Sequence, residues 1–374
     1  MTLLPIGAAF GLPVFALGVR RYTHPDNRSF AFTVFYAVLC ISSAFGGLLI
    51  TFARAHFHDG LDLPWPLSMH LSWMRVNVLL CSACTGYTCA ASCFVRNLRV
   101  EKGVPLEAAR LEPMPRSTAS CSDFMKVVYG SRPFWKLLAI SLIVALGTRA
   151  TFRHLDATFP KYFMRMWGED APFEIFVAVE PIMTVLLSFP VTFVLLRRRI
   201  STSDALIYGT LLQSFCPVAL MYTSYGATFL FVAIMALGEA IWSPRLYEYS
   251  TMVAPEGFEG TFVAVAFVPQ YVSAGVVGVT SGYLLDTYVP DPATLEPGEV
   301  MRPAMLWGMV AAASFVTPLV LSLVKDRLFG DEPTLPNAPP VVTHRASNAG
   351  SGRGRYAMAL PAADPDDARE DILE

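Results

Sequence analysis

The chain has 374 residues, of which 54% are hydrophobic and 16% charged, and its formal net charge is −2. A soluble domain carries charge on about a quarter of its residues. The composition therefore excludes an ordinary soluble protein and predicts an all-α polytopic membrane protein in a lipid bilayer.

Nine apolar segments are long enough to cross a bilayer, because about 20 helical residues span ~30 Å of hydrocarbon. We predict transmembrane helices near residues 2–19, 30–52, 72–95, 134–153, 173–196, 204–223, 227–252, 261–285 and 303–325. Several of them contain Gly or Pro, which the spanning helices of transporters tolerate.

Basic residues are concentrated in alternate loops and fix the expected orientation. They are Arg20, Arg21 and Arg28; Arg96, Arg99 and Lys102; Arg197, Arg198 and Arg199; and Lys325 and Arg327. The positive-inside rule places these loops and the C-terminus in the cytoplasm. We expect an integral protein of the plasma membrane or an endomembrane.

Two polar stretches divide the chain. Residues 97–133 are predicted to be a cytoplasmic linker between a bundle of three helices in 1–96 and a bundle of six in 134–328. Residues 329–374 are rich in Pro, Gly and charge, and they are predicted to form a disordered cytoplasmic tail.

The third segment contains four cysteines, Cys81, Cys84, Cys89 and Cys93. Their number is typical of a metal site, but they spread over more than one face of a helix and have no His or carboxylate near them. We therefore expect no metal here.

The fourth segment carries a polar cluster. Arg149, Arg153 and Asp156 repeat at i, i+4 and i+7 and share one helix face. Arg149 lies inside the apolar run, which favours a cavity-lining role. For Arg153 and Asp156 two interpretations stay open: an outer gate, or an exposed ion pair worth under about 1 kcal/mol.

The fifth segment pairs an acid with a kink, because Glu180 precedes Pro181. Glu180 is either a gate or coupling residue within the membrane or a side chain that reaches toward outer water. The sequence leaves both possibilities open.

The stretch 238–260 is the most informative part of the seventh segment. Glu239, Trp242, Arg245 and Tyr249 fall within about a third of a helical wheel, and Pro244 lies among them. Ionisable side chains at membrane depth cost a few kcal/mol each and usually line a cavity or a proton path. We predict that these four residues and Arg149 line a substrate cavity; the alternative is a structural salt bridge between helices.

The same stretch resembles a family pattern. Glu239, Ser243–Pro244, Glu248–Tyr249 and Ala254–Pro255 resemble the tenth-helix pattern E-x-x-x-S-P-x-x-x-E-F/Y, followed by A-P, of proton-dependent oligopeptide transporters in the major facilitator superfamily. The resemblance implies that the glutamate at position 239 lines the substrate cavity. We also consider Glu248 a candidate gate or coupling residue.

The first two segments extend the resemblance. Gly11-Leu12-Pro13-Val14 and Phe35-Tyr36, with Cys40 and Ser42 downstream, are similar to the fourth and fifth helices of that family. The resemblance implies that the nine segments are helices four to twelve of a twelve-helix fold. The E-x-x-E-R motif of the family's first helix is absent, and Leu12 and Cys40 replace a lysine and an asparagine linked to proton coupling and peptide handling.

Two functions follow as alternatives. The first is a secondary active transporter of a small polar or charged solute, similar to an amino acid or peptide and coupled to protons. In it Glu239 either carries the coupled proton or stays ionised as a fixed counter-charge to Arg245 or to a cationic group of the substrate. The second is a non-transporting membrane scaffold or receptor, or a truncated major facilitator product. No nucleotide-binding loop or Ser/His/Asp arrangement occurs, so we expect no enzymatic activity, cofactor, metal or nucleic-acid partner.

Overall fold

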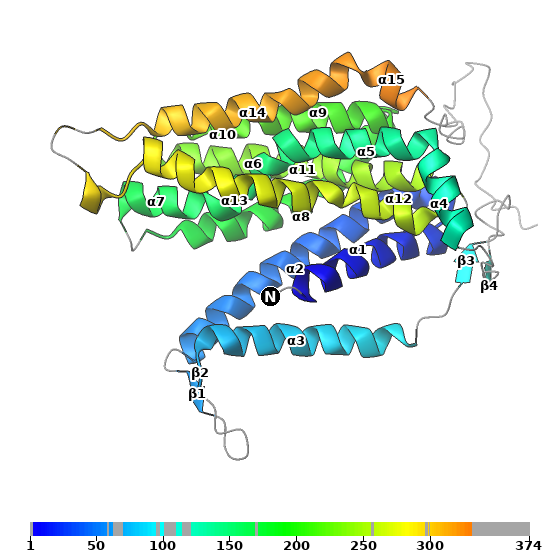
Figure 1. The fold of residues 1–374 in the computed structure, drawn as a ribbon, viewed down its shortest axis with the longest axis horizontal. Helices are drawn as coiled ribbons and strands as arrows, with labels where there is room; N and C mark the ends of the chain where they lie inside the picture. Colours follow the sequence, from blue (N-terminus) through cyan, green and yellow to red (C-terminus); the bar gives the residue numbers. More distant parts are fainter. Residues whose placement is uncertain are drawn as a thin grey trace, which may run out of the picture. The chain divides into compact units, whose positions relative to one another are not determined.

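A computed structural model describes residues 3–57, 60–62, 70–94, 98–100, 110–113, 121–168, 171–255, 258–295, 298 and 300–330. The chain divides into two compact units, Met1–Thr334 and Leu335–Glu374. The described residues all belong to the first unit, and they are almost entirely helical (Figure 1). The predicted tail beyond Gly330 lies outside the described residues.

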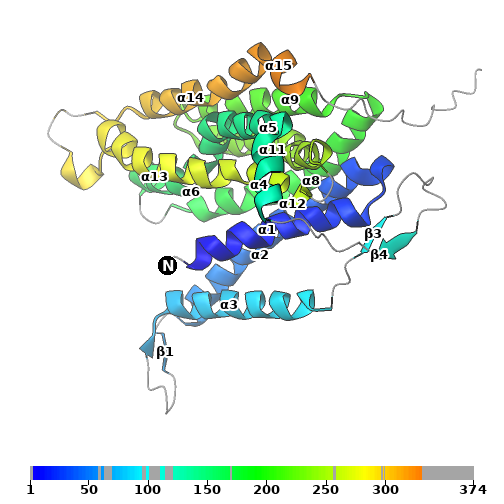
Figure 2. The ribbon, with the colours of Figure 1, turned by 45° about the vertical axis from the view of Figure 1, so that its right-hand side comes forward.

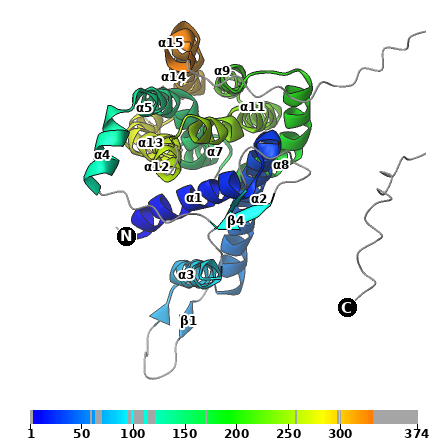
Figure 3. The ribbon, with the colours of Figure 1, turned by 90° about the vertical axis from the view of Figure 1, so that its right-hand side faces the viewer.

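The first part of the chain forms α1 (Leu3–Tyr22), the short η1 (Pro25–Asn27), α2 (Arg28–His56) and α3 (Trp73–Ser92). Two antiparallel pairs of short strands flank α3: β1 (Leu61–Asp62) with β2 (His70–Leu71), and β3 (Leu98–Val100) with β4 (Leu111–Pro113). Figures 2 and 3 show α3 set apart from the other helices, beside the far end of α2.

The rest of the described chain folds into a helical bundle. Its elements are α4 (Cys121–Gly130), α5 (Arg132–Val144), the π-helical turn η3 (Ala145–Arg149), α6 (Ala150–Ala157), α7 (Phe159–Trp167), α8 (Phe173–Arg197), α9 (Thr202–Ser214), α10 (Cys216–Ala219), α11 (Tyr225–Met252), α12 (Glu259–Ala266), α13 (Val268–Tyr288), η4 (Pro292–Thr294), α14 (Pro303–Leu323) and α15 (Lys325–Phe329).

Within the described residues, six helical stretches are long and apolar enough to cross a membrane. They are Pro25–Gly46, Arg132–Ala157, Phe173–Arg197, Tyr225–Met252, Glu259–Tyr288 and Pro303–Leu323. The protein is therefore an integral, all-α membrane protein, as the composition predicts. The segments predicted at 2–19, 72–95 and 204–223 contain α1, α3, and α9 with α10, but these helices are not among the six, so the count of nine stays a prediction.

The segment near 204–223 is divided for a local reason. Pro217 has no backbone N–H and lies in the first turn of α10, so the helical hydrogen bonding of α9 does not continue through it. The stretch 97–133, predicted as a linker, contains β3, β4 and α4, and Val128 of α4 is buried against the core.

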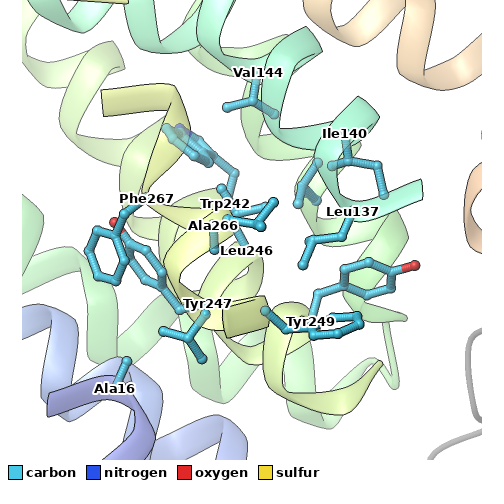
Figure 4. Packing of buried hydrophobic residues seen from close by; sticks show 14 of the residues in the cluster. Ala16, Leu137, Ile140, Val144, Trp242, Leu246, Tyr247, Tyr249, Ala266 and Phe267 are labelled. Atoms are coloured by element: carbon cyan, nitrogen blue, oxygen red, sulfur yellow. The ribbon is translucent and has the colours of Figure 1, made fainter. Parts of the chain in front are cut away.

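The long helix α11 is the centre of the fold, and it packs against α2, α8, α9 and α12. Its approach to α9 depends on two glycines. A Cβ on Gly209 would lie 2.7 Å from Trp242, and a Cβ on Gly238 would lie 2.6 Å from the Cβ of Gln213. Figure 4 shows Trp242 and Leu246 of α11 near Leu137, Ile140 and Val144 of α5 in this core.

Candidate functional site

A buried ion pair joins Arg149 to Glu239. The Nη1 atom of Arg149 lies 3.0 Å from Oε1 of Glu239, and the side chains are 10% and 2% exposed. Both residues lie in helical stretches that can span a membrane. Inside a membrane each charge loses its hydration, and the attraction between the two charges offsets part of that cost.

Arg149 is the last residue of the π-helical turn η3, which sets the position of its side chain. Turns of this kind interrupt α-helices and often occur at functional sites. Thr317 of α14 packs into the turn: its hydroxyl donates to the Ile143 carbonyl at 2.9 Å and accepts from the Thr148 amide at 3.1 Å. A Cβ on Gly147 would lie 2.3 Å from Oγ1 of Thr317, so glycine is required for this contact.

Other groups hold the Arg149 guanidinium in place. Its Nη2 donates to Oε1 of Gln270 on α13 at 3.1 Å, and its central carbon lies 4.6 Å from the ring centroid of Phe152. Such a cation–π contact adds to the attraction when the cation is desolvated. The guanidinium therefore links η3 with α11 and α13.

The Glu239 carboxylate has further neighbours. The Tyr36 hydroxyl of α2 donates to its Oε1 atom. Its Oε2 atom is buried without a hydrogen-bond partner among the described residues. Glu180 of α8 is buried as well, accepts a hydrogen bond from Thr184 at 2.9 Å, and interacts electrostatically with Glu239 and Arg149.

The charges of this group do not cancel when all are ionised. Glu180 and Glu239 contribute two negative charges and Arg149 one positive charge. Burial of a net charge is costly, so the site favours one more positive charge, either a proton or a cationic group. We call Arg149, Glu180, Glu239, Tyr36 and Gln270 the central site; each comes from a different spanning stretch.

Arg245 belongs to a second cluster rather than to the central site. It forms a buried ion pair with Glu248 on the same helix. Its Nη2 donates to the hydroxyls of Thr33 on α2 and Thr192 on α8, both at 3.1 Å. The Ser29 hydroxyl donates to Glu248, so α2 contacts both members of the pair.

Trp242 and Tyr249 point toward other helices. The Trp242 indole donates to the side-chain carbonyl of Gln213 on α9. The Tyr249 hydroxyl donates to the Leu328 carbonyl at 3.5 Å, and its ring packs on Phe329 with centroids 5.2 Å apart. Because α11 packs against several helices, residues on one third of its wheel meet different neighbours. That Trp242 and Tyr249 line a substrate cavity stays a prediction.

Arg153 and Asp156 contact each other at 3.1 Å, with side chains 24% and 45% exposed. The structure thus brings them together as a partly exposed pair on α6, and Asp156 also interacts electrostatically with Arg149. Their role as an outer gate stays a prediction.

The sequence does not predict four residues that contact the buried charges: Tyr36, Gln270, Thr33 and Thr192. Gln270 was detectable in principle, because it is an amide in an apolar segment. The two threonines gave no signal, since isolated hydroxyls are common in membrane helices and bond to their own backbone.

No protein-family model matches the sequence, and a comparison with curated proteins finds no match. Among the described residues, no group of three or more His, Cys, Asp or Glu side chains is arranged to hold a metal ion. The family resemblance therefore rests on the motifs quoted above.

Proposed function

We propose that the protein is a secondary active transporter of a small polar or charged solute. The observation that carries this proposal is the Arg149–Glu239 pair, buried at the meeting point of membrane-spanning helices. Buried ionisable groups inside a membrane are costly and mark substrate or ion pathways in transporters. Their convergence from separate helices is typical of a binding site near the middle of the bilayer.

The proposed architecture is of the major facilitator type, in the branch of proton-dependent oligopeptide transporters that the motif at 238–260 resembles. In this proposal the described helices correspond to helices four to twelve, and the C-terminus is cytoplasmic. Transport would occur as α1–α3 rock against the following bundle around the central site.

The substrate class follows from the charges of the central site. Arg149 suits a carboxylate, and the acidic pair Glu180 and Glu239 suits an ammonium group or a proton. A zwitterion such as an amino acid or short peptide satisfies both demands. Binding of a proton to the acidic pair would release Arg149 for the carboxylate, which would couple proton and substrate movement.

Flux measurements on the purified full chain in liposomes test this proposal. The probes are a mixture of the twenty common amino acids and a mixture of dipeptides, with a trapped pH-sensitive dye as the readout. We expect inward proton movement on addition of one mixture, and none in liposomes containing Glu239→Gln. A scaffold or receptor would give no flux with either mixture.

A further inference from the structure

A line of polar side chains runs along the interface of α2, α8 and α11, from the central site to the Arg245–Glu248 pair. We call it the polar seam. Its members are Ser29, Thr33 and Tyr36 on α2, and Glu180, Thr184, Ser188 and Thr192 on α8. The members on α8 are spaced four residues apart, so they share one helix face, and all of them are buried.

Hydrogen bonds connect parts of the seam. The Thr184 hydroxyl donates to Glu180 at 2.9 Å, and the Ser188 hydroxyl donates to the Thr184 carbonyl at 2.6 Å. The hydroxyls of Thr33 and Thr192 lie 2.8 Å apart. From position 180 to position 192 the seam covers about 18 Å of helix at a rise of ~1.5 Å per residue.

Arg245 lies across one end of the seam. Its guanidinium donates to both Thr33 and Thr192 and pairs with Glu248, and its side chain is 5% exposed. A guanidinium does not lose its proton in proteins, so it cannot relay one. Its fixed positive charge also repels an approaching cation, as a buried arginine does in pores that exclude protons.

The position of Arg245 along the helices shows which end it closes. Thr192 lies near the end of α8 at Arg197, and Glu248 lies near the end of α11 at Met252. Ser29 lies in the first turn of α2. Arg245 therefore stands between Glu239 and the end of the molecule that carries the basic loops after α1 and α8.

We propose that Arg245 is the residue that stops protons from leaking along the polar seam between the central site and the basic-loop end. The proposal rests on the proposed function in one respect, since it takes the acidic pair of the central site to exchange protons. Without such a barrier, a hydroxyl-lined path would dissipate the gradient that drives uptake.

Passive proton flux tests this role without any substrate. The purified full chain is reconstituted in liposomes with a trapped pH-sensitive dye, and an external pH step is applied with the membrane potential clamped by potassium and valinomycin. Glu248 partly offsets the charge of Arg245, so the barrier depends chiefly on a guanidinium that cannot release its proton. We therefore expect Arg245→Gln to raise the passive proton flux several-fold, and Arg245→Lys, which keeps the charge, to leak less than Arg245→Gln.

Two further variants separate a leak from general damage. Arg165→Gln is the matched control, because Arg165 joins α7 to α13 at the opposite end through the Val289 carbonyl at 2.7 Å and Asp286 at 3.2 Å. Its flux should equal that of the parent. Arg245→Gln/Glu248→Gln removes both charges of the buried pair together, with Arg28 as the remaining charge beside it, and it should leak even if the single variant folds poorly.

Passive proton flux tests the barrier role of Arg245, and substrate flux tests the transport function, so each can fail without the other. Equal passive flux in the parent and in the double variant would overturn the barrier role, as would an equal leak in Arg165→Gln. Addition of Thr192→Val to the leaking variant should reduce the flux, since it removes a hydroxyl from the seam. Absence of substrate flux alongside this leak pattern would refute the transporter but not the barrier.

Discussion

Glu239 and Arg245, six residues apart on α11, belong to separate buried ion pairs. Glu239 contacts Arg149 of η3 at 3.0 Å, whereas Arg245 contacts Glu248 on its own helix. Each charge is therefore compensated by a different partner. A proton or ligand that changes the Glu239 pair leaves the Arg245 pair in place, so the two clusters can serve different purposes.

The Arg149–Glu239 pair should show strong energetic coupling. Arg149→Gln leaves the Glu239 carboxylate buried without its cation, and removal of one partner from a buried pair costs about 3–5 kcal/mol. We expect a clear drop in the thermal unfolding temperature in detergent, followed by tryptophan fluorescence. Arg149→Gln/Glu239→Gln should recover most of the loss, because neither charge then remains. Additive losses in the double variant would show that the two side chains do not interact.

The close approach of α9 to α11 predicts a second stability effect. In Gly238→Ala the new methyl group would lie 2.6 Å from the Cβ and 2.8 Å from the backbone N of Gln213. Overpacking of this kind costs about 1–3 kcal/mol, because a neighbouring backbone cannot move aside easily. Gly278→Ala is the control, since no atom beyond its own helix backbone lies within 4 Å of its added Cβ. Equal unfolding temperatures for the two variants would argue against the tight α9–α11 contact.

The sequence predicted much of the fold but only part of the site. Apolar length identified the six described stretches that can span a membrane, and the burial cost of charge identified Arg149, Glu239 and Glu180 as unusual. The ion-pair partner of Arg245, Glu248, lies three residues along the same helix, at a spacing that places side chains next to each other. Its contacts with Thr33 on α2 and Thr192 on α8 were not predictable from a helical wheel, because a wheel does not say which helix lies opposite. Tyr36 and Gln270 reach Glu239 and Arg149 only through long-range packing, which no local pattern encodes.

A covalent cross-link between α2 and α8 should stop transport if the two helices must separate at each cycle. The hydroxyls of Thr33 and Thr192 lie 2.8 Å apart, so this pair is the choice for a cysteine cross-link between α2 and α8. If the helices must separate at each cycle, Thr33→Cys/Thr192→Cys should lose flux on oxidation and regain it on reduction. Each single cysteine variant, oxidised in the same way, is the control. Undiminished flux in the cross-linked protein would show that this contact stays closed during transport.

The behaviour of Glu239→Gln under two driving conditions tests whether Glu239 takes part in transport. The substitution keeps the size of the side chain and its contact with Tyr36 but removes the charge that faces Arg149. With the purified protein in liposomes and the amino-acid or dipeptide mixture as probe, we predict that uptake driven by a proton gradient falls to background in the variant. Exchange of substrate at equal pH on both sides should persist if Glu239 carries the coupled proton, and it should be lost if Glu239 binds the substrate itself. Gradient-driven uptake at the parent rate in a folded Glu239→Gln protein would show that Glu239 neither carries a coupled proton nor binds the substrate.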